Sequence, residues 1–116
     1  MKKVELKDAP EYSASGHFGC VSLRLHHKDL TGSQSFWVGL SHFLPKGGAE
    51  MAGSEVERIY VVLSGNITVT GADGKEVQMG PMDSLYLAPG EKRSILNKTN
   101  LPVSMLVMAA YPKPQP

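Results

Sequence analysis

The chain contains very little cysteine: Cys20 is the single one among 116 residues, so no disulfide can form within the chain. The lack of a disulfide framework is typical of proteins in a reducing compartment, and we expect a cytoplasmic protein. No apolar run approaches the roughly 20 residues that cross a bilayer, and the segment Met1–Asp8 has no apolar signal region, so no membrane role is expected. The formal net charge is +1 without a basic block, which argues against a nucleic-acid surface.

Clustered metal ligands are also missing from the sequence. The four histidines include no pair at the i, i+2 spacing that would place two imidazoles on one face of a strand, and no Cys-x2-Cys occurs. His26 and His27 are adjacent, so on a strand their side chains point to opposite faces. His17 falls in a Ser/Gly-rich segment that favours a loop, and it carries no predicted role.

What the chain does contain is a series of short strand-like runs. Val, Leu, Ile, Phe and Tyr are concentrated in segments separated by Gly, Pro, Asn and Asp, which predicts an all-β sandwich or barrel. The expected strands cover 19–26, 35–44, 58–63, 66–70, 84–87, 93–96 and 103–110. Ser64-Gly65 and Ala72–Lys75 are predicted hairpin turns. Hydrophobic residues make up 41% of the chain, enough for one packed domain over 1–111, followed by a loose Pro-rich tail over 112–116.

Two stretches resemble the paired signatures of a known family. Residues 46–65 have the spacing of the pattern G-x5-H-x-H-x3-E-x6-G, and residues 82–97 have that of G-x5-P-x-G-x2-H-x3-N. Lys46 and Met82 replace the first glycines and Ala88 replaces the proline, whereas the retained residues are Gly65, Asp83, Gly90 and Asn97. These are similar to the signatures of the cupin superfamily. The resemblance implies a double-stranded β-helix, or jelly-roll barrel, in which the N-terminal third supplies edge strands and a dimer contact.

The metal ligands of that family are replaced in this chain. The two signature histidines fall on Ala52 and Ser54, the glutamate falls on Arg58, and the last histidine falls on Arg93. These residues lack the imidazole and carboxylate donors that hold a transition metal. The resemblance therefore implies a cupin without a metal, and no cofactor is expected.

Strand alternation then predicts which side chains face the barrel interior. If the ligand positions of the family point inward, so do Ala52, Ser54, Arg58, Tyr60, Val62, Arg93 and Ile95. On the preceding strand, Phe36, Val38, Leu40, His42 and Leu44 form the more apolar face, which predicts that His42 lies on the inner wall. Tyr86 is a further candidate for the wall.

Arg58 and Arg93 are expected to converge in one cavity. Two cations in a partly dry site repel and lose hydration, at a cost of several kcal/mol, so an anion should accompany them. One candidate is a bound carboxylate or phosphate, which a guanidinium binds through two parallel hydrogen bonds. The alternative is structural: the arginines turn to solvent or pair with protein carboxylates, for which the candidates are Glu50, Glu55, Glu57 and Glu91.

The leading hypothesis is a metal-free cupin that binds a small anionic organic molecule and forms a homodimer. The predicted substrate-binding residues are Arg58, Arg93, Ser54, Ala52 and Tyr86. If the protein is an enzyme, we expect proton transfer or isomerisation beside a carboxylate or enolate, with His42 or Tyr60 moving the proton. Two alternatives stay open: a non-catalytic binding or sensor domain, and a metal-dependent cupin with a shifted ligand set.

Overall fold

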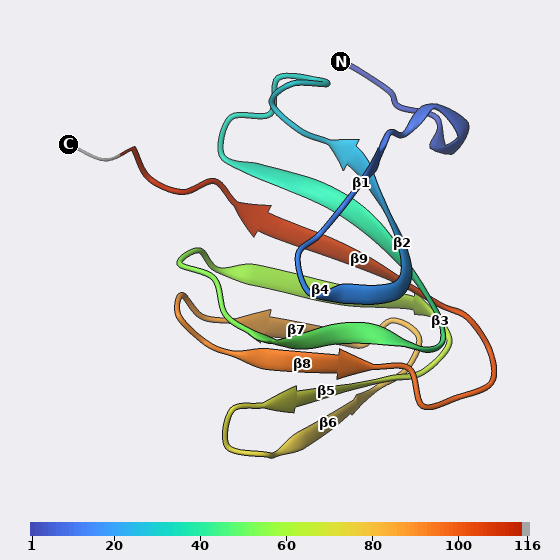
Figure 1. The fold of residues 1–116 in the computed structure, drawn as a ribbon. Helices are drawn as coiled ribbons and strands as arrows, with labels where there is room; N and C mark the ends of the chain where they lie inside the picture. Colours follow the sequence, from blue (N-terminus) through green and yellow to red (C-terminus); the bar gives the residue numbers. More distant parts are fainter. Residues whose placement is uncertain (115–116) are drawn as a thin grey trace.

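The computed structural model describes residues 1–114 and is built almost entirely from β-strands (Figure 1). Among the described residues, no helix has the length and apolar character to cross a membrane. One short 3-10 turn, η1 (Leu6–Asp8), precedes the strands. These are β1 (Glu11–Tyr12), β2 (His17–His26), β3 (Phe36–Ala52), β4 (Arg58–Ser64), β5 (Ile67–Gly71), β6 (Glu76–Met79), β7 (Ser84–Leu87), β8 (Arg93–Leu96) and β9 (Val103–Ala110).

The strands form one antiparallel sheet that curls into a nearly closed barrel (Figure 1). Its order is β6-β5-β8-β3-β9-β4-β7, with β2 also paired to β3 and β1 paired to β2. The first half of β3 pairs with β9, and its second half pairs with β8. This long strand therefore joins the two walls of the barrel. The arrangement confirms the predicted all-β jelly-roll class.

Two glycines allow β3 to pass from one wall to the other. A Cβ atom at Gly48 would collide with the carbonyl oxygen of Ile95 on β8, and one at Gly47 would collide with the carbonyl oxygen of Gly19 on β2. Backbones that approach this closely exclude any side chain. The Gly-Gly pair therefore lies inside a strand, at the point where three strands meet.

Two signature positions keep the backbone shape of glycine although they are not glycine. Lys46 and Met82 occupy the first position of each signature, with φ angles of 68° and 69°. Among the described residues these are the two non-glycine positions with positive φ. The left-handed conformation is unfavourable for side chains with a Cβ atom. The loop geometry of the signatures has therefore been retained with local backbone strain.

The barrel interior is an apolar core drawn from strands β3 to β9. Its fully or nearly buried members are Phe43, Ala49, Tyr60, Val62, Ile67, Val69, Met79, Leu87, Ile95, Val103 and Met105. The bounds of β7, β8 and β9 agree with the predicted strands, whereas β1 and β6 were not predicted and β3 extends to Ala52. The turn at 72–75 joins the paired strands β5 and β6, as predicted. The hairpin predicted at Ser64-Gly65 is wrong, because β4 pairs with β7 and β9 and not with β5.

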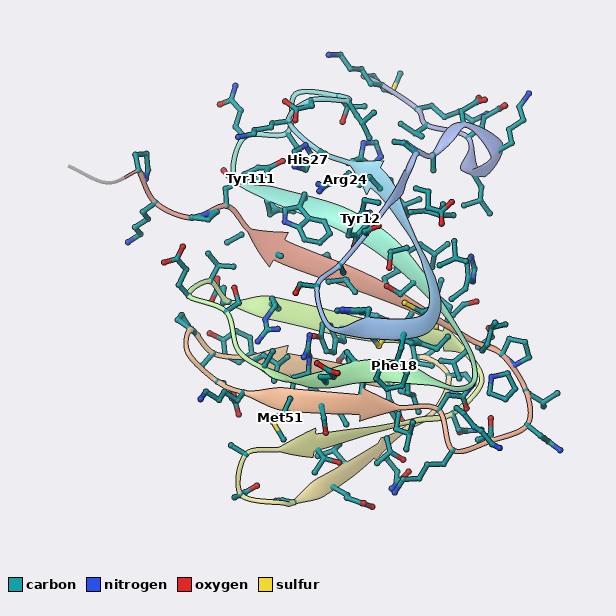
Figure 2. The ribbon with its side chains drawn as sticks, in the orientation of Figure 1. Tyr12, Phe18, Arg24, His27, Met51 and Tyr111 are labelled. Carbon is teal, nitrogen blue, oxygen red and sulfur yellow. The ribbon has the colours of Figure 1, made fainter. Side chains whose placement is uncertain are left out.

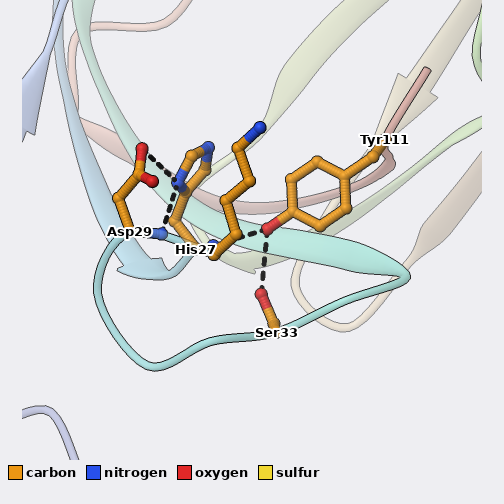
Figure 3. Close-up of polar contacts among 5 residues, drawn as sticks. His27, Asp29, Ser33 and Tyr111 are labelled. Atoms are coloured by element: carbon orange, nitrogen blue, oxygen red, sulfur yellow. Dashed lines mark hydrogen bonds and ion pairs between the residues drawn. The ribbon is translucent and has the colours of Figure 1, made fainter. Parts of the chain in front are cut away.

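Tyr111 anchors the chain after β9 to the loop between β2 and β3 (Figure 3). Its hydroxyl oxygen accepts from the backbone N–H of Lys28 at 2.7 Å and lies 2.9 Å from the Ser33 hydroxyl. The His27 ring meets the Tyr111 ring edge-on, with 5.6 Å between their centroids. Residues 112–114 of the predicted tail form neither helix nor strand, and 115–116 lie outside the described residues.

Candidate functional site

The barrel contains a partly open cavity of about 180 Å³ between its two walls. It is lined by Tyr12, Ala14, His17, Trp37, Ser41, Phe43, Arg58, Tyr60, Arg93, Ile95, Met105 and Val107. Larger hollows lie elsewhere on the described chain, with volumes of about 500, 420, 370 and 230 Å³, and those of 500 and 370 Å³ lie near the start of β4 and the end of β9. The smaller interior cavity is the better candidate site, because both predicted arginines and several aromatic side chains converge on it.

Arg58 enters the cavity from β4 and is 8% exposed. Alternation along β4 places Arg58, Tyr60 and Val62 on the inner face, as predicted. One terminal nitrogen of Arg58, Nη2, donates to the carbonyl oxygen of Glu91 at 3.0 Å. Its Nε is a buried nitrogen without a hydrogen-bond partner within the described part of the chain. A buried charged donor without an acceptor is costly, so this guanidinium has binding capacity left.

Arg93 enters the cavity from β8 and is 6% exposed. Its Nη1 lies 3.1 Å from the carbonyl oxygen of Glu50 and 3.5 Å from that of Ala52. Its Nε donates to the Tyr60 hydroxyl oxygen at 2.9 Å. Because Tyr60 accepts this bond, its own hydroxyl hydrogen is free to be donated to another group.

Neither arginine is neutralised by a carboxylate of residues 1–114. The ion pairs of the described chain involve Lys3, Lys7, His27 and Lys98. Of the four candidate glutamates, Glu57 accepts from the Tyr86 hydroxyl at 2.8 Å and Glu91 accepts from the backbone of Ala88 at 3.0 Å. The alternative in which the arginines pair with protein carboxylates is therefore not supported by the geometry of the described residues. Both charges are buried with backbone carbonyls and a tyrosine as their partners.

An aromatic wall covers one side of the cavity. The rings of Tyr12 and Trp37 meet edge-on with their centroids 5.8 Å apart, and the guanidinium of Arg24 lies 4.6 Å from the Tyr12 ring centroid (Figure 2). Gly39 leaves room for this wall, because a Cβ atom there would come within 2.9 Å of Trp37 and 3.0 Å of the Tyr12 hydroxyl. Burial raises the pKa of Tyr12 above its ordinary value of 10.0, so its hydroxyl stays protonated at neutral pH. This wall was not predicted from the sequence.

His17 is a second cavity residue that the sequence did not reveal. It pairs with Ala49 across β2 and β3, and Ala49 pairs with Ile95 on β8, so the three side chains form one inward-facing row. Burial lowers the pKa of His17 below its ordinary value of 6.5, and the charge of Arg93 acts in the same direction. The ring is therefore neutral at physiological pH.

The predicted inward orientation of His42 is wrong. The inner face of β3 is formed by Trp37, Ser41 and Phe43, and Phe43 is fully buried. His42 therefore points outward, where its Nδ1 lies 2.9 Å from the Ser104 hydroxyl. The prediction assumed that the more apolar face of the strand points into the barrel. In the structure that face, which also carries Phe36 and Leu44, points outward.

Three other predicted binding residues also lie away from the cavity lining. Ala52 is exposed and Ser54 is half-buried, because the pairing of β3 with β8 shifts register between Ala49 and Ala52 and the strand then ends. The Ser54 hydroxyl accepts from the backbone of Val56 at 3.3 Å. Tyr86 is 55% exposed, since Leu87 faces inward on the same strand.

The donor set does not fit the metal centre that the signatures imply. Alanine, serine and two arginines occupy the ligand positions, and a guanidinium cannot coordinate a cation. Over residues 1–114, no group of three or more His, Cys, Asp or Glu side chains is placed to hold a metal ion. The residues at these positions therefore do not fit the metal of the family, and the groups left to act in this cavity are its own side chains.

Comparison with known proteins identifies the protein family to which the chain belongs. The family model of the cupin domain matches residues 39–109, and the chain belongs to the cupin superfamily. It is 42% identical over 112 residues to a β-D-galactosidase of Mycobacterium tuberculosis, a match that covers 97% of this chain and 96% of the relative.

Solved structures show the same fold. The polyketide cyclase RemF of Streptomyces resistomycificus superposes with a TM-score of 0.87 at 21% identity, over 99% of this chain and 82% of that one. A sugar phosphate isomerase of Silicibacter pomeroyi gives a TM-score of 0.77 at 23% identity, over 96% of this chain and 76% of that one. At these identities the likeness establishes the barrel and not its chemistry.

Proposed function

We propose that this cupin works without a metal and binds a small anionic organic molecule in its barrel, with Arg58 and Arg93 as the anion-binding groups. The observation that carries the proposal is the burial of both guanidinium groups in one cavity without a carboxylate partner among residues 1–114. A carboxylate or phosphate would supply the missing countercharge and accept from the unpartnered Nε of Arg58. Tyr60 would donate its free hydroxyl hydrogen to the same ligand.

The cavity limits the size of that ligand. Its volume of about 180 Å³ is below the roughly 300–1,000 Å³ of pockets for drug-sized molecules. The Trp37 and Tyr12 rings offer apolar faces, and the Ser41 hydroxyl lines the cavity beside them. This combination suits a molecule the size of a monosaccharide that carries one acidic group. The 42% identity to a protein named as a β-D-galactosidase supports a sugar-like ligand.

The test compares two sugars that differ in one group. D-galacturonate carries a carboxylate at the position where D-galactose carries a hydroxymethyl group. We expect calorimetry to show binding of D-galacturonate and at least tenfold weaker binding of D-galactose, because charge-assisted hydrogen bonds contribute about 1.5–3 kcal/mol. Equal affinity for the two sugars, or no binding of D-galacturonate, would refute the arginine pair as an anion site. Elemental analysis of the same dialysed sample should find well below one transition metal per chain, whereas a stoichiometric metal would favour a shifted ligand set.

A second candidate function, hydrolysis of β-galactosides, is favoured by the whole-chain identity to that relative. The cavity geometry argues against it, because glycosidases use two carboxyl groups and pass through a positively charged transition state. The residues that line the interior cavity include two arginines and no Asp or Glu. Release of nitrophenol from p-nitrophenyl β-D-galactopyranoside by the purified protein, with loss in Arg58→Met, would support hydrolysis in the barrel. Binding of D-galacturonate without turnover of any tested sugar would favour the sensor alternative.

A further inference from the structure

The position of His17 depends on the register of three strands. His17, Ala49 and Ile95 are cross-strand partners on β2, β3 and β8, and Arg93 is the inward residue that precedes Ile95 on β8. The His17 ring stacks on Phe43 with their centroids 6.5 Å apart and their planes 21° apart. A packed ring on a paired strand has little freedom, so this histidine is held against the cavity.

One hydrogen bond selects the tautomer of His17. Its Nδ1 lies 3.1 Å from the carbonyl oxygen of Ser15, which can only accept, so in the neutral ring Nδ1 carries the hydrogen. Nε2 then carries the lone pair, and no hydrogen bond within residues 1–114 involves it. The lowered pKa noted above keeps this nitrogen unprotonated at neutral pH.

The groups around His17 suit a developing negative charge. Arg93 and Arg58 line the same cavity, and both remain cationic at any accessible pH. The Tyr60 hydroxyl, which accepts from Arg93, has a hydrogen to donate. The remaining titratable group of the lining, Tyr12, is neutral. A neutral base beside cationic and hydroxyl donors is the arrangement that proton abstraction next to a carbonyl requires.

We infer that His17 is the proton-transferring residue of this cavity, and that the ligand class is a sugar acid with a C–H bond next to its carbonyl group. The inference rests on the proposed function, because the ligand must first bind to the arginine pair. In the open-chain sugar, Nε2 takes the proton from C2. The electron pair of the broken C–H bond forms the C1–C2 double bond, and the carbonyl π electrons move onto O1.

The resulting enediolate oxygen, O1, accepts from the Tyr60 hydroxyl, while the arginine pair holds the carboxylate at the other end of the sugar. Return of the proton to C2 regenerates the starting sugar. Delivery of the proton to C1, with transfer of the O2 hydrogen to O1 and formation of the C2–O2 double bond in place of the C1–C2 double bond, gives the ketose. No oxidant, reductant or metal enters either route, so atoms and electrons balance within the sugar and the histidine.

The experiment follows deuterium exchange at C2 of D-galacturonate by proton NMR in D2O. We expect the wild type to exchange this hydrogen, His17→Gln to exchange it at least a hundredfold more slowly, and the matched control His42→Gln to match the wild type. D-galacturonate affinity, measured by calorimetry, should change less than about threefold in His17→Gln. The wild-type rate should rise with pH through the pKa of His17 and then level off, which a purely structural role would not produce.

The outcomes separate the two proposals. Binding of D-galacturonate without exchange by the wild type, or equal exchange by His17→Gln, overturns the role of His17 and leaves the anion site standing. Absence of binding overturns both. Nitrogen-15 NMR of the wild type needs no variant: a neutral Nδ1–H tautomer at pH 7 supports the inference, and an Nε2–H tautomer overturns it.

Discussion

The Nε of Arg93 and the hydroxyl oxygen of Tyr60 are joined by a 2.9 Å hydrogen bond that crosses the barrel from β8 to β4. These strands are separated by β3 and β9 in the sheet, so the bond links opposite walls of the cavity. It fixes the guanidinium plane of Arg93 and turns the Tyr60 hydroxyl into a donor. The geometry of the anion site therefore depends on this pair.

Tyr60→Phe should separate the two roles of that hydroxyl. The substitution leaves a buried charged donor without an acceptor, and we expect the free energy of unfolding to fall by about 1–3 kcal/mol. D-galacturonate affinity should also fall, because the ligand loses a donor. Urea unfolding and calorimetry measure the two effects. Tyr86→Phe is the matched control, since its hydroxyl bonds to Glu57 on the surface; unchanged affinity in Tyr60→Phe would remove Tyr60 from the site.

Lys46→Gly and Met82→Gly should each stabilise the protein by about 1 kcal/mol. Both residues hold positive φ, at 68° and 69°, where a Cβ atom is unfavourable and glycine is not. Urea unfolding should show a higher midpoint for each variant. Lys46→Ala and Met82→Ala retain a Cβ atom and serve as controls that should not gain stability. A loss of stability in both glycine variants would show that the lysine and methionine side chains outweigh the backbone strain.

His17 should make the stability of the barrel depend on pH. Its pKa in the folded state is lowered, chiefly by burial, from the ordinary value of 6.5 that the unfolded chain retains. Below about 6.5 the unfolded chain therefore binds a proton that the folded chain does not, so stability falls as pH decreases until the folded-state pKa is passed. His17→Gln should flatten this part of the profile in urea unfolding at pH 5 to 7.5. The pKa of His27 is also lowered, by desolvation and by Arg24, so some slope should persist in the variant. An unchanged profile would show that His17 is not desolvated.

Some side-chain orientations in the site follow from the local sequence and could be predicted, whereas others depend on long-range strand pairing and could not. Arg58, Tyr60 and Arg93 were placed correctly because signature spacing fixes the register and alternation then fixes the face. His42 was misplaced because β3 is apolar on both faces, so hydrophobicity could not distinguish inside from outside. His17 could not be found from sequence, since its inward position depends on long-range pairing with Ala49.

We propose that the apolar outer face of β3 is covered by a second copy of the chain. Cross-strand pairing aligns Val38 with Met108 and Met108 with Ile59, so apolar side chains run across β3, β9 and β4. Ile59 and Val21 of the flanking strands are each 41% exposed. Adjoining apolar side chains that are exposed on neighbouring strands are typical of a protein–protein interface. Light scattering should give twice the 12.5 kDa chain mass.

Ile59→Glu should yield a monomer, because a charge at the interface lacks a partner. Leu101→Glu in the loop between β8 and β9, where Leu101 is 65% exposed, is the matched control and should remain dimeric. A monomeric wild type at micromolar concentration would refute the dimer. Dissociation of both variants would place the interface elsewhere.

Arg58→Met should weaken ligand binding without weakening the ligand-free protein. Arg58 makes one hydrogen bond, to the Glu91 carbonyl, and buries an unpartnered Nε, so methionine removes more unfavourable desolvation and repulsion than favourable bonding. We expect a melting temperature equal to or slightly above that of the wild type, and D-galacturonate affinity at least tenfold lower.

Arg93→Met should lower affinity similarly but cost more stability, because Arg93 bonds to Tyr60 and to two backbone carbonyls. If both substitutions lowered the free energy of unfolding by more than about 2 kcal/mol while affinity stayed unchanged, the arginines would be structural partners rather than an anion site. The contrast between the two variants is informative because the cavity holds one arginine with unused donors and one that is largely satisfied.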